Sequence, residues 1–132
     1  MDPALSQSVR QRAGHRCEYC RLPQACSPLR FHVDHIVARQ HGGGEELENL
    51  AQACPECNRH KGTNLSGVDP DTGEVVRLFH PQRDRWEDHF RLEGAQIIGR
   101  TAVGRTTAWL LEMNVEDRRR WRELLFRLGK WK

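Results

Sequence analysis

The stretch FHVDHIVARQHGGG, residues 31 to 44, combines strand-forming apolar residues, histidines and an aspartate with a run of three glycines. A CEYC motif precedes it and a CPEC motif follows it. β-Branched and aromatic residues favour a strand across RFHVDHIV, and the glycines predict a connecting loop. A second short strand is expected near Leu50 to Ala53, before a helix with Pro55 in its first turn. This order predicts an α+β fold built on a hairpin and a helix.

The cysteines form two C-x-x-C pairs, Cys17 with Cys20 and Cys54 with Cys57. Two such pairs supply the four thiolates of a tetrahedral zinc, so we predict a structural Zn²⁺ that fixes both ends of the strand-bearing insertion. Zinc binding can contribute roughly 10–16 kcal/mol to folding, which a small core cannot supply. The alternative is a redox dithiol, which two pairs flanking a hairpin disfavour. Cys26 is left as a loop or packing thiol.

Length and composition predict one small globular domain over residues 1–132. The chain has 132 residues, of which 37% are hydrophobic and 30% charged, so only a modest core can form. No apolar run has the length of a membrane span, and the N-terminal residues lack the apolar segment of a secretory signal. We therefore expect a cytoplasmic protein without a membrane partner. A net charge of +3 is too small to identify a polyanionic partner by itself.

The remaining chain predicts a first helix and a C-terminal extension, residues 64–132, around a core at 14–63. Ser6 can cap a helix that runs to about Ala13. Turn residues predict two hairpins, one turning at 71–73 and one at 93–94. Helices are expected in 105–114, mostly buried, and in 116–131, where the apolar stripe comprises Trp121, Leu124, Leu125 and Leu128.

The end of the chain, from Arg118 to Lys132, is rich in arginine and lysine and contains one acidic residue, Glu123. A basic segment of this kind can contact nucleic acid, and it can equally be the solvated face of a helix. The sequence leaves both interpretations open.

Taken in order, CEYC, VDHI, GG, ENLAQ and CPECNRHKG over residues 17–62 resemble the HNH endonuclease family. The likeness is to its zinc-stapled members with a ββα-metal or treble-clef core, in the branch whose third motif residue is asparagine. The resemblance implies a metal-dependent enzyme that hydrolyses phosphodiester bonds in DNA. No motif of residues 64–132 adds a named chemistry.

Phosphodiester hydrolysis needs a base for the attacking water and a cation for the charge that develops on the phosphate. His35 matches the first motif residue, which implies that its imidazole is the general base. Asp34 offers a carboxylate to Mg²⁺ or Mn²⁺, and the resemblance places Asn58 as the second ligand. Asn49 matches the middle motif residue, whose implied catalytic role is to brace the loop and orient His35.

The geometry of a strand raises a question about Asp34 and His35. Neighbouring side chains of a regular strand face opposite sides, whereas His32 and Asp34 share a side. We expect a twist or a bulge that brings Asp34 and His35 to the same phosphate. His32 is kept as a secondary candidate for the catalytic metal, with a half-exposed strand histidine as the alternative.

Four basic residues are candidate DNA contacts. Arg39 and His41 lie in the expected loop, where solvated side chains are the alternative, and Arg59 and Lys61 lie on the expected helix. Two rival functions remain. One is a zinc module that binds nucleic acid without cutting it, and the other is a protein-interaction module that uses the tryptophan-rich tail. The joint presence of all the motif residues argues against the first rival.

Overall fold

The computed structural model describes residues 1–131, and Lys132, the last residue of the predicted basic segment, lies outside the described residues. Contacts divide the chain into two compact units, with the division between Thr63 and Asn64. The predicted organisation as one domain of residues 1–132 stays a prediction. No helix in the described part of the chain combines the length and the apolar character needed to cross a membrane.

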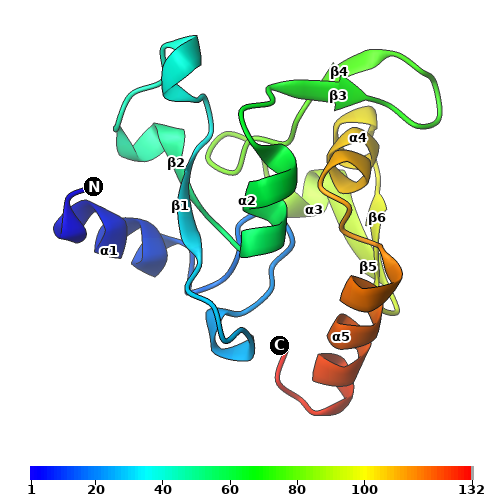
Figure 1. Ribbon diagram of the computed structural model, residues 1–132. Helices are drawn as coiled ribbons and strands as arrows, with labels where there is room; N and C mark the ends of the chain where they lie inside the picture. Colours follow the sequence, from blue (N-terminus) through cyan, green and yellow to red (C-terminus); the bar gives the residue numbers. More distant parts are fainter. Residues whose placement is uncertain (132) are drawn as a thin grey trace. The chain divides into compact units, whose positions relative to one another are not determined.

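The first unit is a small hairpin followed by a helix, with a further helix before it (Figure 1). Strands β1 (His32–His35) and β2 (Leu50–Ala53) pair antiparallel, and His35 stands opposite Leu50. Helix α2 (Pro55–Lys61) packs against both strands, and α1 (Pro3–Arg12) packs against β2. Short 3-10 turns occupy Gln24–Cys26 (η1), Arg39–His41 (η2) and Leu47–Asn49 (η3). The predicted α+β arrangement of two strands and a helix is confirmed.

The start of α1 differs from the prediction. Asp2, rather than Ser6, caps the helix, because its carboxylate accepts a hydrogen bond from the Ala4 backbone N–H at 2.9 Å. Pro3 follows at the first helical position, where its missing N–H costs nothing. Ser6 therefore lies inside the helix. Both residues are common caps, and the aspartate came one turn earlier in the sequence.

The second unit contains two hairpins and three helices. Its elements in chain order are β3 (Ser66–Val68), β4 (Val75–Arg77), α3 (Trp86–His89), β5 (Phe90–Glu93), β6 (Gln96–Gly99), α4 (Ala102–Leu110) and α5 (Glu116–Arg127). β3 pairs with β4 and β5 with β6, both antiparallel, so the two predicted hairpins are confirmed. The buried apolar side chains of this unit are Leu78, Phe79, Phe90, Ile97, Ala108, Leu111, Met113 and Leu125.

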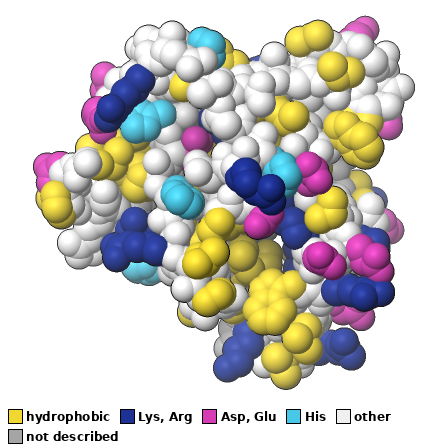
Figure 2. Space-filling model, in the orientation of Figure 1, with side chains coloured by type: hydrophobic (Ala, Val, Ile, Leu, Met, Phe, Trp, Pro, Cys, Tyr) yellow, Lys and Arg dark blue, Asp and Glu magenta, His cyan; other side chains and the backbone are white. Residues whose placement is uncertain are grey.

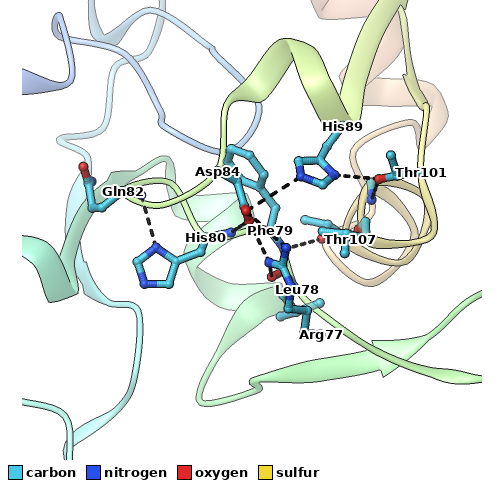
Figure 3. Close-up of polar contacts among 11 residues, drawn as sticks. Arg77, Leu78, Phe79, His80, Gln82, Asp84, His89, Thr101 and Thr107 are labelled. Carbon is cyan, nitrogen blue, oxygen red and sulfur yellow. Dashed lines mark hydrogen bonds and ion pairs between the residues drawn. The ribbon is translucent and has the colours of Figure 1, made fainter.

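A polar network joins β4, α3 and α4 inside the second unit (Figure 3). The Asp84 carboxylate accepts hydrogen bonds from both terminal nitrogens of Arg77, at 2.7 and 3.1 Å, and from the His80 backbone N–H at 2.8 Å. His89 lies between Asp84 and Thr101, with its Nδ1 2.6 Å from the Thr101 hydroxyl. Burial opposes ionisation of Asp84, but the bonds from Arg77 and His80 outweigh it and lower its pKa. The network ties the loop after β4 to the start of α4.

Helix α4 approaches the second hairpin so closely that only glycine fits at the contact. A Cβ on Gly104 would lie 2.0 Å from the His89 carbonyl oxygen, well inside van der Waals contact. Thr101 caps the same helix by accepting a hydrogen bond from the Gly104 N–H. The expected mostly buried character holds for Thr106, Thr107 and Ala108, whereas Trp109 is exposed.

Helix α5 presents a different face from the one predicted. Trp121, Leu124 and Leu128 are exposed, and Leu125 alone of the predicted stripe is buried. Arg122 is buried instead, because its guanidinium donates to the Ala95 and Met113 carbonyl oxygens at 2.6 and 2.9 Å. An arginine that reaches two backbone carbonyls can therefore occupy the inner face of a helix.

Candidate metal centre and active-site pocket

The four cysteines of the two C-x-x-C pairs are buried together. Their sulfur atoms all lie within 4.8 Å of one another, and Cys20 and Cys54 are 3.8 Å apart. A tetrahedral site with Zn–S bonds of about 2.3 Å separates its sulfurs by about 3.8 Å. Backbone N–H groups of Cys20 and Cys57 point at the sulfurs of Cys17 and Cys54, each at 3.4 Å. The cluster is positioned to bind a metal ion and is consistent with structural zinc.

The electrostatics of the cluster favour a bound cation. Burial raises the pKa of the Cys17 and Cys57 thiols well above the ordinary value, because removing a thiolate from water is costly. A metal ion reverses this balance, since a coordinating thiol loses its proton. In the described part of the chain these cysteines are the one group of at least three His, Cys, Asp or Glu residues placed to share an ion.

The metal centre is joined to β1 through a buried hydrogen-bonded group of Tyr19, Asp34 and Lys61. Tyr19 sits between the first two cysteines, and its hydroxyl donates to Asp34 Oδ2 at 2.8 Å. Lys61 follows Cys57 by one helical turn, and its ammonium lies 3.2 Å from the same oxygen. The ammonium also donates to the His35 and Ile36 carbonyls, at 3.3 and 3.1 Å. Tyr19, from the first cysteine pair, and Lys61, from the helix of the second pair, therefore both hold the last residues of β1.

This group fixes the environment of Asp34. Its side chain is 6% exposed, and burial raises its pKa, although Lys61 and Tyr19 act in the opposite direction. The Lys61 side chain is 2% exposed, so its ammonium balances a carboxylate inside the protein. The expectation that Lys61 contacts a DNA phosphate does not fit this position.

His35 and Asn58 line one pocket of about 460 Å³ between β1, the loop after it and the end of α2. Val33, Asp34, Ala38, Arg39, Gln40, Gly62 and Thr63 complete its wall. Among the described residues, the Asn58 side-chain amide makes no hydrogen bond. The pocket therefore brings together an imidazole, an amide and the edge of a carboxylate.

The loop after β1 is held by Asn49. Its side chain accepts a hydrogen bond from the Val37 N–H at 2.9 Å and donates to the Val37 and Gly44 carbonyls at 3.0 and 2.8 Å. Its backbone carbonyl accepts from the Ile36 N–H at 2.8 Å. A Cβ at Gly43 would lie 1.7 Å from the Val37 carbonyl oxygen, so the loop can close this tightly only with glycine.

β1 is a regular strand. Its four residues pair one to one with β2, so no bulge occurs between His32 and His35. Asp34 turns inward to Tyr19 and Lys61, and His35 lies on the other side of the strand. His32 is exposed. Of the twist or bulge expected from the sequence, the bulge is absent, and Asp34 and His35 nevertheless both line the pocket.

The remaining candidate DNA contacts are exposed. Arg39 and Arg59 have side chains 71% and 67% exposed, and each pairs with a neighbouring glutamate, Glu45 and Glu56. His41 is exposed in the 3-10 turn η2. Figure 2 shows basic side chains in several separate places on the visible face, most of them beside acidic ones.

The basic segment at the end of the chain is largely engaged within the second unit. Arg118 donates to the Leu111 and Glu112 carbonyls, Arg119 donates to the Asn114 carbonyl, and Arg120 pairs with Glu116. Several arginines of the basic segment, including buried Arg122, therefore stabilise the second unit through contacts within it.

Sequence reasoning missed Tyr19 and Glu45 and misplaced Lys61. Helical periodicity held the signal for Lys61, because a residue four positions after a buried cysteine lies on the same face of the helix. Tyr19 lies inside the first C-x-x-C, where a large aromatic residue between buried ligands indicates packing. No pattern marks Glu45, whose place beside His35 depends on how the glycine loop closes.

The comparison with family models agrees with this geometry. Residues 17–64 match the model described as HNH endonuclease, so the resemblance found in the sequence is confirmed for this part of the chain. The match includes both cysteine pairs, the hairpin and α2.

One curated relative is similar over a longer stretch. It is named Septu protein PtuB, from Bacillus thuringiensis, and is 23% identical over 118 residues. The alignment covers 88% of this chain, and the chain spans 43% of the length of that protein. The likeness therefore extends well into the second unit. No solved structure gives a significant match.

Proposed function

We propose that this protein is a metal-dependent HNH endonuclease that hydrolyses phosphodiester bonds in DNA. The observation that carries the proposal is the pocket in which His35 and Asn58 meet, at the open end of a hairpin whose base is fixed by four cysteines. The match of residues 17–64 supports the same reaction class. A reducing cytoplasmic compartment suits a site of four free thiols.

In this mechanism His35 is the general base. Its imidazole takes a proton from a water molecule, and the resulting hydroxide attacks phosphorus as the bond to the leaving oxygen breaks. Asn49 is a positioning residue, because it holds Val37 and Gly44 and thereby the loop that follows His35. Lys61 adds a second restraint through the carbonyl of His35 itself.

A catalytic Mg²⁺ or Mn²⁺ fits the oxygen donors of the pocket. Asp34 and Asn58 are the residues that would hold it, because carboxylate and amide oxygens are the ligands these ions prefer. When bound, the cation supplies neutralisation of the charge that develops on the phosphate. Lys61 already balances part of the Asp34 charge, so the pocket alone should bind a divalent cation weakly. His32 stays a secondary candidate ligand.

Arg39, His41 and Arg59 are the proposed contacts to DNA phosphates. All three are exposed, and Arg39 also lines the pocket. Lys61 is left out of this set because it is buried. Since phosphate contacts release counterions, DNA affinity should fall with rising salt concentration.

The test is cleavage of supercoiled plasmid with and without Mg²⁺ or Mn²⁺, comparing the parent protein with His35→Ala. We expect His35→Ala to retain fold, zinc and DNA affinity and to lower the cleavage rate by roughly 10²–10⁴-fold. His41→Ala is the matched comparison, since it removes an exposed histidine of the same loop: as a proposed phosphate contact it should weaken DNA binding but keep the parent cleavage rate at saturating DNA. Equal cleavage by His35→Ala and the parent would show that this mechanism is wrong.

The same assay separates the metal residues from the base. Asp34→Ala and Asn58→Ala should lose activity that returns in part at high Mg²⁺ or Mn²⁺, whereas the His35→Ala defect should persist. A parent protein that binds DNA but never cuts it would favour the zinc module without catalysis. A parent that does neither would favour a protein-interaction module.

A further inference from the structure

We infer that Glu45 is a positioning residue for His35, whose carboxylate keeps a proton on His35 Nε2 and thereby leaves Nδ1 to act as the base. The inference rests on the proposed function of the pocket and adds to it the ring nitrogen that reacts and the group that selects it.

The first observation is the environment of the imidazole. His35 lines the pocket, yet its Nε2 atom is buried and has no hydrogen-bond partner among the described residues. A buried ring nitrogen without a partner is costly, so the surrounding structure should supply one. Because Nε2 is withdrawn from solvent, Nδ1 is the nitrogen that remains for a water molecule in the pocket.

The second observation is the carboxylate beside that nitrogen. Glu45 Oε1 lies 3.4 Å from His35 Nε2, within ion-pair distance but outside hydrogen-bond geometry. Catalytic hydrogen bonds are often long in the absence of substrate and shorten when it binds. Glu45 is exposed in the loop that follows the three glycines, so its side chain can change rotamer and close this distance.

The third observation is that the same carboxylate is already ionised and shared. Arg39 donates to Glu45 Oε1, and this bond is the main cause of a lowered pKa for Glu45, with a smaller contribution from His35. An ionised carboxylate favours the tautomer that carries its proton on the facing nitrogen, and it stabilises the imidazolium formed later. Arg39 is also a proposed phosphate contact. When it binds a DNA phosphate, its bond to Glu45 would break, and the Glu45 carboxylate could then accept a hydrogen bond from His35 Nε2.

The proton balance follows from this assignment. Water gives one proton to His35 Nδ1, and the ring then carries protons on both nitrogens. Glu45 keeps its negative charge throughout and takes no proton. The hydroxide forms the new P–O bond while the bond to the leaving oxygen breaks, and solvent protonates the leaving oxygen.

The kinetic test compares Glu45→Ala and Glu45→Gln with Glu46→Gln, which removes the same charge one position away. We expect Glu45→Ala to lower kcat by roughly 10–100-fold, the usual scale for removing the group that orients a functional histidine. Glu45→Gln keeps an acceptor oxygen, so its kcat should lie between those of Glu45→Ala and the parent. KM should not rise, because removing an anion beside bound DNA favours binding. Glu46→Gln should share the KM effect and keep the parent kcat.

An unchanged kcat in Glu45→Ala would overturn the inference.

A spectroscopic test does not depend on cleavage. In the zinc-loaded protein labelled with ¹⁵N, long-range ¹H–¹⁵N correlation above the titration range of imidazole should show His35 with its proton on Nε2. Glu45→Ala should mix the two tautomers, and Glu46→Gln should leave the spectrum unchanged. A proton on Nδ1 in the parent would overturn the inference even if the enzyme cuts DNA. The expected spectrum in a protein that does not cut would instead count against the proposed function alone.

Discussion

Residues 1–63 and 64–131 keep their interiors together by different means. The first unit buries four cysteines, an aspartate and a lysine, whereas the second packs an aromatic cluster in which Phe79 and Phe90 meet edge to face at 5.2 Å. Apolar burial stabilises in any solution condition near neutral pH, but a buried thiol cluster depends on its metal. The comparison teaches that the unit with the candidate active site is the one whose fold we expect to depend on a bound metal ion.

The carboxylates of the two units show the same contrast. Burial raises the pKa of Asp34 in the first unit, whereas hydrogen bonds from Arg105 lower the pKa of Asp69 in the second to about 2. Asp34 is enclosed with its counter-ion, while Asp69 is bonded by an arginine whose side chain is 30% exposed. The ionised form is therefore disfavoured at one carboxylate and favoured at the other.

The largest effect should come from removing the metal. Cys57→Ser, or a strong chelator, should unfold residues 1–63, because metal binding of this kind is worth roughly 10–16 kcal/mol of folding. Every tryptophan of the chain lies after residue 64, and the one tyrosine, Tyr19, lies before it. Tryptophan fluorescence therefore reports on the second unit alone.

We expect the zinc content to fall and the tyrosine environment to change while the tryptophan transition in urea stays close to that of the parent. Cys26→Ser is the control, since it removes a cysteine outside the cluster. A tryptophan transition lost together with the metal would break the comparison, because the two units would then fold as one.

The next effect concerns the buried ion pair. Lys61→Met leaves the Asp34 carboxylate buried without its ammonium, and breaking such a pair typically costs about 3–5 kcal/mol. Arg59→Met, on the exposed side of the same helix, should change stability by no more than about 0.5 kcal/mol. Urea unfolding of the zinc-loaded proteins measures both.

The double variant Asp34→Asn with Lys61→Met sharpens this result. It removes both charges, so it should be more stable than Lys61→Met alone. If the second change brought no recovery, Lys61 would contribute mainly through its bonds to the His35 and Ile36 carbonyls.

A smaller effect should appear in acid. The folded pKa of Asp69, about 2, is below its ordinary value of 3.8, so the unfolded chain binds more protons between these values. Its contribution to stability is complete above about pH 4 and is lost as the pH falls through about 2. The tryptophan-monitored urea midpoint should therefore decline between pH 5 and pH 2. Asp69→Asn should flatten the decline, and an equal slope in both proteins would remove Asp69 as its source.

The smallest effects are expected on the surface. Arg39→Ala and Arg59→Ala each remove one proposed phosphate contact, so each should weaken DNA binding a few-fold and reduce the salt slope by about one. Neither should alter folding. Arg127→Ala, in the exposed part of α5, is the comparison for the second unit. A larger loss of affinity for Arg127→Ala would move the DNA contact to the end of the chain.

Local patterns predicted the elements that depend on near neighbours in the sequence. The strand at Leu50–Ala53 and the helix opened by Pro55 are confirmed, as are both hairpins, because turn residues and alternation act over a few positions. Each C-x-x-C pair is also a local pattern, and the four-thiolate chemistry of a structural zinc predicted that the two pairs meet.

Side-chain orientation could not be predicted in the same way. Arg122 is buried because two carbonyls from distant segments converge on it, and Trp121 is exposed on the helix face that composition marked as apolar. The pairing of Asp34 with Tyr19 and Lys61 likewise joins three segments. Such contacts depend on the tertiary fold, so secondary-structure propensity and hydrophobic periodicity do not predict them.

Because Lys61 is buried, its chemical modification can report how often this part of the protein opens. The lysines of the chain are Lys61, Lys130 and Lys132, and an amine-reactive reagent can modify only an ammonium that reaches solvent and loses its proton. Lys61 can therefore react only during transient opening of the helix that follows the metal site. In protein loaded with zinc, the rate of its acylation, compared with that of exposed Lys130, would measure how often the unit of residues 1–63 opens.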